Sequence, residues 1–250
     1  MASRKEEKER LRQAREQAEA ADRKQERKRL VLGYVVAGVI SLAVVVGIVY
    51  AVVGGSDSGG GSGGGGDRLN ESFGGVLPKN ITVDDRESAE APSDGNTVDL
   101  EEAAEAAGCE LLREQKDEGA THIPESDGVP DYEANPPTSG DHNVEPLADG
   151  AFVQAPSPLN YIHSLEHGRI QIQYSSELPQ DEQLQLLGLY DEDPAGMVVF
   201  PNDDMPYLVA ATAWRQTLGC DSYEGAATLD AFRAFRSEFR ARGPEPIAMN

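Results

Sequence analysis

The longest uninterrupted run of apolar positions lies near the beginning of the chain. From residue 30 to residue 53 there is no charged side chain, and Ser41 is the single polar interruption apart from two tyrosines. These 24 residues exceed the roughly 20 that a helix needs to cross the hydrocarbon core of a bilayer. A secretory signal peptide would have a shorter apolar core, of about 7–15 residues. The pattern therefore predicts one retained transmembrane helix, residues 30–53.

The residues before this run are polar and mainly basic. Residues 1–29 hold 11 Lys and Arg against 7 acidic residues, so their net charge is 11 − 7 = +4. Lys and Arg beside a transmembrane segment stay on the cytoplasmic side. We expect a cytoplasmic basic arm at 1–29, and a single-pass protein of the cell membrane whose remaining chain is extracytoplasmic.

The apolar run is followed by a long stretch with no regular period. Residues 54–66 are almost entirely glycine and serine, the composition of a flexible coil. Residues 67–97 are rich in Asp, Glu, Ser, Asn and Pro and poor in aromatic side chains, which is typical of disorder. The sequence predicts a flexible linker over residues 54–97.

Short periodic segments return after residue 98. Polar and apolar positions alternate over 169–174, which predicts a half-buried strand, and the apolar runs 197–200 and 208–213 predict two more. An acidic first turn and a glycine stop at Gly108 predict a short helix at 99–107, and apolar positions at helical spacing predict helices at 180–190 and 226–242. Strands and helices mix without a regular βαβ alternation. We therefore expect an α+β domain over 98–250, with a small mixed or antiparallel sheet and flanking helices.

The net charge differs between the two expected sides of the membrane. The whole chain carries −22, from 22 Lys and Arg and 44 Asp and Glu. Subtracting the basic arm leaves 11 basic and 37 acidic residues from position 54 onward, a balance of −26. A nucleic-acid-binding domain needs a basic surface, so this class of partner is excluded for the outer part. The membrane is the partner that the sequence indicates, and it identifies no protein partner.

All four histidines fall between positions 122 and 167. His163 and His167 are four residues apart, a spacing that puts both imidazoles on one face of a helix, and Gly168 would end that helix. A loop rich in Pro and Gly, residues 136–142, presents His142. We expect His142, His163 and His167 to bind a transition metal.

A fourth ligand position would remain open to several side chains. The candidates are His122, Met205, Asp141, Glu166 and Met197. Met205 stands in a loop and is more available than Met197, which begins an apolar run. A thioether ligand would favour copper over zinc, because soft sulfur suits Cu(I). Copper or zinc is therefore the expected ion, with copper preferred. Glu166 can also be a carboxylate that orients an imidazole.

Two other functions remain open for the same histidines. His163, Glu166 and His167 match the inverted zincin pattern H-x-x-E-H, in which the glutamate is the catalytic base and a distant carboxylate, here Glu224 or Glu238, would complete the zinc site. Prolines before His163 and Gly168 after it leave room for a helix of barely two turns, whereas zincins use a long one. The third alternative is a structural or partner-binding module whose histidines brace the loop. The sequence favours binding over catalysis.

Several motifs of the outer domain resemble a known family. They are GCELL at Gly108, HIPE at His122, NPPTSGDH ending at His142, HSLEHG at His163, and ATAW ending at Trp214 with Gly219-Cys220. Together, over about residues 107–247, they resemble the bacterial membrane-anchored family called domain of unknown function 3105. The resemblance implies an extracytoplasmic domain behind one transmembrane helix, with no established activity. The acid before His142, Asp141, departs from the more apolar loop of many relatives.

The chain has two cysteines, Cys109 and Cys220. On the outer side of a membrane thiols oxidise readily, so we expect a disulfide in preference to a metal-thiolate role. The bridge would join the start of the domain to a position just before its last helix and would close a long loop. By the chain-entropy model such a loop contributes roughly 4–5 kcal/mol of stability.

Overall fold

The computed structural model describes residues 68–70, 74–95 and 99–247. All of them belong to one compact unit of the chain. Within these residues no helix is long and apolar enough to cross a membrane. The expected basic arm, the transmembrane helix 30–53 and the Gly/Ser stretch 54–66 lie outside the described residues.

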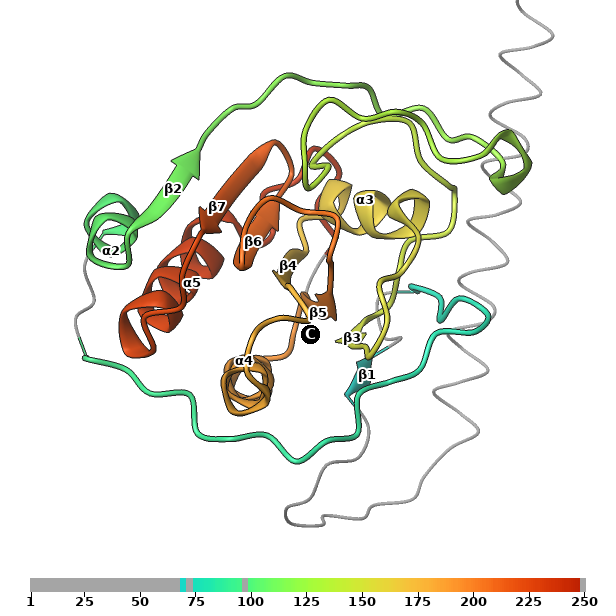
Figure 1. Ribbon diagram of the computed structural model, residues 1–250. Coiled ribbons are helices and arrows are strands. Elements are labelled where there is room, and N and C mark those ends of the chain that lie inside the picture. The colour runs from blue at the N-terminus through green and yellow to red at the C-terminus, as the bar shows by residue number, and fades with distance from the viewer. Residues whose placement is uncertain (1–67, 71–73, 96–98, 248–250) are drawn as a thin grey trace, which may run out of the picture. The chain divides into compact units, whose positions relative to one another are not determined.

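The unit is a seven-stranded mixed sheet covered by helices on both faces, which confirms the α+β class (Figure 1). The strands, in the order β1-β3-β5-β4-β6-β7-β2 across the sheet, are β1 (Leu69–Asn70), β2 (Cys109–Leu112), β3 (Asp149–Ala151), β4 (Ile170–Tyr174), β5 (Met197–Pro201), β6 (Val209–Ala213) and β7 (Gln216–Cys220). The helices are α2 (Leu100–Ala106), α3 (Pro158–Glu166), α4 (Gln180–Glu192) and α5 (Ala226–Phe239), with a single 3-10 turn, η1 (Glu125–Asp127).

The centre of the sheet is parallel and both sides are antiparallel. Strands β3, β5 and β4 run in the same direction, and helices α3 and α4 form the crossovers β3-α3-β4 and β4-α4-β5. The expectation of no regular βαβ alternation missed this run, because β3 has only three residues and no periodic pattern. Strands β6, β7 and β2 continue the sheet as antiparallel neighbours.

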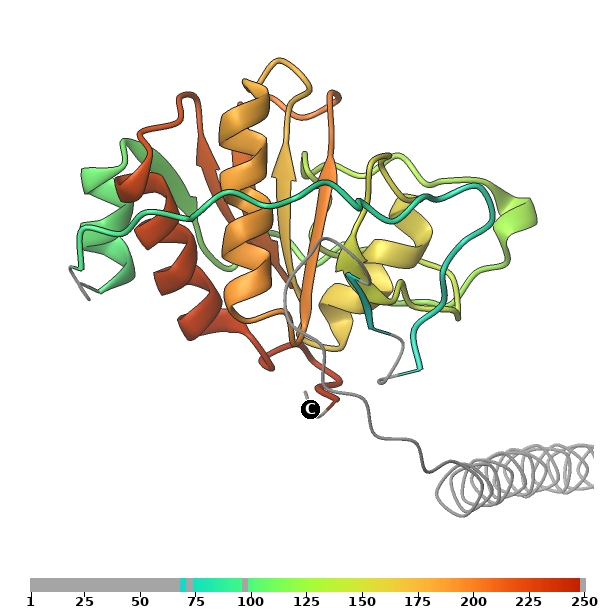
Figure 2. The ribbon, with the colours of Figure 1, turned by 90° about the horizontal axis from the view of Figure 1, so that it is seen from below.

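Alternate residues of the central strands face different helices. On β5, Val199 joins the core formed with α2, α4 and α5, whereas Val198 packs with Tyr161 and Ile162 of α3. Helix α3 therefore covers one face of the sheet and the other helices cover the opposite face, as Figure 2 shows for α4 and α5. This arrangement explains why β4 is buried on both sides rather than half-buried as expected.

The polar residues of β4 are buried beneath α3 and form a hydrogen-bonded network. Gln171 donates to the carbonyl oxygen of Tyr161 at 2.7 Å, and Gln173 donates to Gln171 and to Thr212 of β6. An amide can be buried when its hydrogen bonds are satisfied in this way. The alternation along β4 therefore predicted the strand correctly. The polar side of the strand, however, is buried beneath α3 and not exposed to solvent.

The part of the expected linker that the structure describes is packed against the domain. Strand β1 pairs with β3, and the buried Arg68 makes a two-point ion pair with Asp191 at 2.8 and 2.9 Å. The following stretch crosses α4, as Figure 2 shows, and comes so close that a Cβ on Gly188 would collide with the carbonyl of Ala89. The flexible-linker prediction was wrong for 68–70 and 74–95, since their composition hides these long-range contacts.

Candidate metal centre

Helix α3 carries two of the site residues at its carboxyl end. The side chain of Ser157 accepts a hydrogen bond from Leu159 N and caps the start of the helix. The helix ends at Glu166, and Gly168 follows the C-cap with a φ of +81° that favours glycine, at a point where a Cβ would strike the backbone of Ala241. His163 and Glu166 stand three positions apart, so both side chains lie on one face.

The Pro- and Gly-rich loop places His142 beside that face. The loop is joined to an upstream segment by a parallel bridge between His122 and His142. Its hydrogen bonds run from His142 N to Thr121 O at 3.0 Å and from Ile123 N to His142 O at 2.7 Å. Tyr132 donates its hydroxyl to Asp141 O at 2.8 Å and lies against Gly140, where a Cβ would strike the ring. Two histidines 20 positions apart are thus fixed side by side.

Four side chains converge at this point, and we call them the histidine cluster: His122, His142, His163 and Glu166. Oε2 of Glu166 lies 3.2 Å from Nε2 of His142 and 3.9 Å from the Nε2 atoms of His163 and His122. One ligand atom from each residue lies within 4.8 Å of all the others. This spacing suits a single ion that replaces their direct contacts.

The cluster is closed to solvent except at one member. His142, His163 and Glu166 are buried, whereas the side chain of His122 is 43% exposed. The rings of His122, His142 and His163 lie 4.7 to 5.1 Å apart. The indole of Trp214 meets the ring of His142 edge-on at 6.4 Å. An ion would therefore reach the cluster past His122.

Backbone carbonyls fix the imidazole tautomers. Nδ1 of His142 lies 2.8 Å from Gly140 O, and Nδ1 of His163 lies 2.7 Å from Asn143 O. Because a carbonyl oxygen only accepts hydrogen bonds, each Nδ1 must carry the proton and each Nε2 presents a lone pair to the cluster. This is the orientation in which metal-binding imidazoles are commonly held.

Burial favours the neutral form of both the imidazoles and the carboxyl group of the cluster. It lowers the pKa of His142, and together with the neighbouring imidazoles of His167 and His142 it lowers the pKa of His163 to about 3. Burial and the nearby Glu245 raise the pKa of Glu166. These opposite directions do not favour a His⁺–Glu⁻ ion pair. Neutral imidazoles facing a carboxylate are instead the donors that a cation would join.

His167 lies next to the cluster and is held by the end of the chain. Its ring lies 4.6 Å from that of His163, as the sequence spacing predicted. Its Nδ1 lies 2.8 Å from Glu245 O, and Arg169 donates to the backbone carbonyl of His167 at 3.2 Å. His167 is the helix C-cap, and it is not in the four-residue group whose ligand atoms converge.

The structure places Met205 beyond the carboxyl ends of the central strands, at the end of the sheet opposite the histidine cluster. Strand β6 is antiparallel to β4, and Met205 precedes β6, whereas Trp214, which contacts His142, follows it. Met205 lines a surface cavity with Ser175, Asp203 and other residues. It does not join the histidines, so the sulfur ligand that favoured copper is not at the site. Met197 is a core residue, as expected.

The carboxylates nominated for a zincin site also lie elsewhere. Glu238 pairs with Arg113 at 2.5 Å, and Glu224 accepts a hydrogen bond from Ser222 at 2.8 Å. Asp141 accepts from Thr121 N at 3.0 Å rather than entering the cluster. Glu166 stands at a ligand position among the imidazoles, and the short helix α3 differs from the long helix of zincins.

The two cysteines form the expected disulfide. Cys109 of β2 lies directly opposite Cys220 of β7 in the antiparallel pair. The bond is far from the histidines along the sheet, and the metal-thiolate alternative is excluded. It ties β2 to β7 at one edge of the sheet.

Sequence reasoning missed the groups that orient the imidazoles. The carbonyl oxygens of Gly140, Asn143 and Glu245 have no side-chain signature, and Glu245 is 78 positions away from its partner. Arg169 and Asp149, a buried pair at 3.1 Å, support the same region because Arg169 also donates to His167 O. The buried ion pair left only one signal in the sequence, an arginine immediately before a strand.

The described domain belongs to the class of α+β proteins with a closed cluster of histidines and one carboxylate. A family model described as "Protein of unknown function (DUF3105)" matches residues 123–250. The chain belongs to this family, as its motifs indicated. His122 stands one position before the matched segment. No curated protein and no solved structure matches the chain.

Proposed function

We propose that this protein binds a divalent transition metal ion in its histidine cluster, on the extracytoplasmic side of the membrane to which residues 30–53 anchor it. One observation carries the metal proposal. Three imidazoles and the carboxylate of Glu166 converge within 4.8 Å, and backbone carbonyls hold the lone pairs of His142 and His163 toward the common centre. When Glu166 is ionised and no cation is bound, electron-rich atoms face each other there.

The ligands of the cluster suit an ion of intermediate softness. Three imidazole nitrogens and one carboxylate oxygen suit Zn²⁺ in tetrahedral coordination and also suit Cu²⁺. Since Met205 lies at the opposite end of the strands, it cannot be a ligand in the cluster, and the thioether argument for Cu(I) no longer applies. Four protein ligands would fill a tetrahedral shell, which favours capture or storage of the ion over hydrolysis. The exposed ring of His122 supplies a route for exchange with solvent.

The membrane part of the proposal is supported by the sequence. A run of 24 uncharged residues follows a basic arm, and the outer part has a balance of −26. An acidic surface attracts cations by its field and would raise their local concentration near the site.

Calorimetric titration of the metal-free, full-length protein with Zn²⁺ and with Cu²⁺ tests the function. We expect one high-affinity site per chain for at least one ion, and loss of this site in His142→Ala and in His163→Ala. Glu177→Gln, which removes an exposed carboxylate away from the cluster, is the matched control and should bind as the parent does. A parent protein that binds neither ion, or histidine variants that bind both normally, would refute the proposal.

A further inference from the structure

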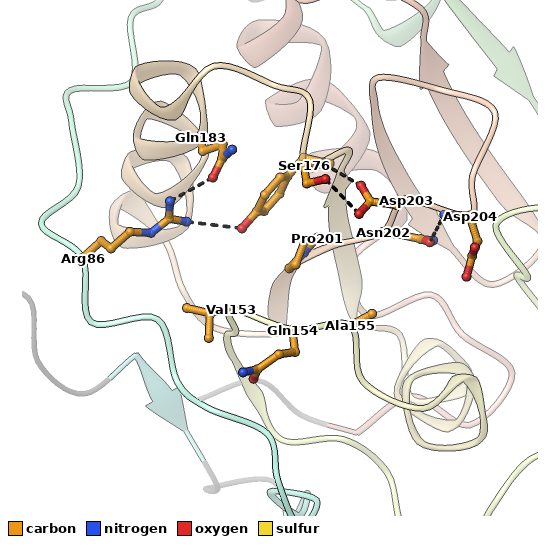
Figure 3. A pocket seen from close by; sticks show the side chains of 11 residues that line it. Arg86, Val153, Gln154, Ala155, Ser176, Gln183, Pro201, Asn202, Asp203 and Asp204 are labelled. Carbon is orange, nitrogen blue, oxygen red and sulfur yellow. Dashed lines mark hydrogen bonds between the residues drawn. The ribbon is translucent and has the colours of Figure 1, made fainter.

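Beyond the histidine cluster, the structure holds a cavity of about 610 Å³ at the carboxyl ends of the parallel strands (Figure 3). Its polar side chains are hydrogen-bonded to one another, as Figure 3 shows for Arg86 with Gln183 and for Ser176 with Asp203. Groups that satisfy each other in this way select no ligand. The situation differs at His167, beside the cluster, where a ring nitrogen suited to metal binding points away from the hydrogen-bonded side of the ring.

His167 presents the lone pair of its Nε2 atom. Its Nδ1 lies 2.8 Å from Glu245 O, and because a carbonyl oxygen only accepts hydrogen bonds, Nδ1 carries the proton of the neutral ring. Nε2 therefore keeps a lone pair, as a metal-binding imidazole nitrogen must. Among the residues that the structure describes, no hydrogen bond or ion pair to this Nε2 is found.

His163, one helical turn earlier, is held in the same way. Its Nδ1 faces Asn143 O at 2.7 Å, so its Nε2 also carries a lone pair. The two rings lie 4.6 Å apart, on the same face of α3. Two histidines four positions apart on a helix are a common pair of ligands for one metal ion. His163 therefore belongs to two sets of donors, the histidine cluster and its pair with His167.

This pair lies between the buried cluster and solvent. The exposed fraction rises from 0% at His142 through 4% at His163 to 9% at His167. Glu245, which holds the ring of His167, is exposed. Burial and then the charge of Glu245 raise the pKa of Glu166, so the field of this outer carboxylate reaches the cluster. A cation that arrives from solvent is drawn toward the pair by that field.

The segment after α5 keeps the ring of His167 in place. Within residues 241–247, Glu245 N donates to Glu166 O at 3.1 Å. A Cβ on Gly243 would collide with Glu166 O, because the segment is packed closely on the end of α3. Since the two ring nitrogens of an imidazole point in different directions, this segment fixes His167 through Nδ1 without using Nε2.

We propose that His163 and His167 form an outer site, through which the metal ion enters and leaves the histidine cluster. The proposal rests on the proposed function, since it needs an ion in the cluster. An ion surrounded by four protein ligands exchanges slowly unless an incoming ligand replaces an outgoing one, and Zn²⁺ tolerates the five-coordinate shell that this requires. His163 stays bound throughout, and the exposed His122 is the ligand that leaves. Because the two sites share His163, the chain binds one ion and not two.

The test is release of the ion from the full-length protein. The protein is loaded with one Zn²⁺ per chain, or with Cu²⁺ if only copper binds, and is mixed with an excess of a chromogenic chelator. His167→Asn is the decisive variant, because its amide nitrogen stands near the position of Nδ1 and can donate to Glu245 O, but it has no Nε2. We expect it to release and take up the ion roughly tenfold more slowly than the parent, with a dissociation constant within about threefold of the parent's.

Two further variants accompany this measurement. His167→Gln, which also lacks an imidazole nitrogen, should slow release as well, so the test does not depend on one variant. Glu177→Gln, an exposed change away from both sites, is the control and should release the ion at the parent rate. Far-ultraviolet circular dichroism checks that each variant is folded.

Release from His167→Asn at the parent rate or faster overturns the outer site, because a ring that only braces the segment would give that result. A loss of affinity of about tenfold or more also overturns it, since His167 would then be a resident ligand. In both cases tight binding by the parent leaves the metal proposal standing, whereas a parent that binds neither ion refutes both proposals.

Discussion

Replacing Glu166 by glutamine should stabilise the metal-free protein and weaken its metal binding. Oε2 of Glu166 lies 3.2 Å from Nε2 of His142, and that nitrogen carries a lone pair because Nδ1 donates to Gly140 O. In the metal-free protein, at a pH above the pKa of Glu166, two acceptors therefore face each other in a buried site. The amide of a glutamine has nearly the same shape and can donate to Nε2 instead.

The size of the effect follows from the burial of both groups. A buried polar group without a matching partner costs about 1–3 kcal/mol, and the new hydrogen bond removes that penalty. For a domain of this length, about 1 kcal/mol shifts the melting temperature by about 2–4 °C. We therefore expect Glu166→Gln to melt roughly 2–12 °C higher than the parent in the presence of a chelator.

Metal binding should change in the opposite direction. A neutral amide is a poorer ligand than a carboxylate, and even partners outside the coordination shell alter metal affinity about 10–100-fold. We expect Glu166→Gln to lose at least about tenfold in affinity for Zn²⁺ and Cu²⁺. The one tryptophan of the chain, Trp214, contacts His142, so its fluorescence can report both melting and metal binding.

Glu177→Gln is the control, because it makes the same chemical change on an exposed side chain. It should alter neither the melting temperature nor the affinity. A Glu166→Gln variant that melts below the parent without metal would show instead that the carboxylate braces the loop, and one that binds metal as tightly as the parent would show that Glu166 is not a ligand.

Three other changes test the framework around the site. Removing the disulfide by Cys109→Ala with Cys220→Ala frees a loop of 111 residues, and urea unfolding should show a loss of about 5 kcal/mol; a loss below about 1 kcal/mol contradicts this. Asp149→Asn removes the carboxylate that pairs with the buried guanidinium of Arg169, so the same assay should show a loss of about 3–5 kcal/mol, and a neutral result would contradict the importance of this pair. A hydrogen bond from Arg240 lowers the pKa of Asp193, so this pair adds stability above the unfolded pKa of about 4 that is lost as the pH falls. Arg240→Ala should flatten that acid-induced loss in pH-dependent melting curves, and an unchanged curve would count against it.

Elements with a strong local pattern could be predicted from the sequence. The alternation before Tyr174 and the apolar positions around Phe232 gave a strand and a helix close to β4 and α5. Strands β1 and β3 have two and three residues, which is too short for any periodic signal. Their pairing depends on distant partners, as does the packing of 74–95 across α4. The same cause hid the burial of Gln171, whose partner is a carbonyl on α3.

The histidine cluster was partly predictable for a similar reason. The spacing of His163 and Glu166 on a helix is local, and the loop that ends at His142 has a distinctive composition. That His122 also joins them depends on a bridge between backbone segments, which side-chain identity does not encode. Met205 was nominated because it stands in a loop between apolar runs. Because β6 runs antiparallel to β4, that loop lies at the end of the strands opposite the histidine cluster.

X-ray absorption spectroscopy of the metal-loaded, full-length protein would identify the ligands of the ion in the histidine cluster. We expect one ion per chain, bound by three imidazole nitrogens and one carboxylate oxygen at about 2.0–2.2 Å, with one imidazole lost in His142→Ala. A protein that retains no Zn²⁺ or Cu²⁺, or an ion with a sulfur ligand, would contradict it.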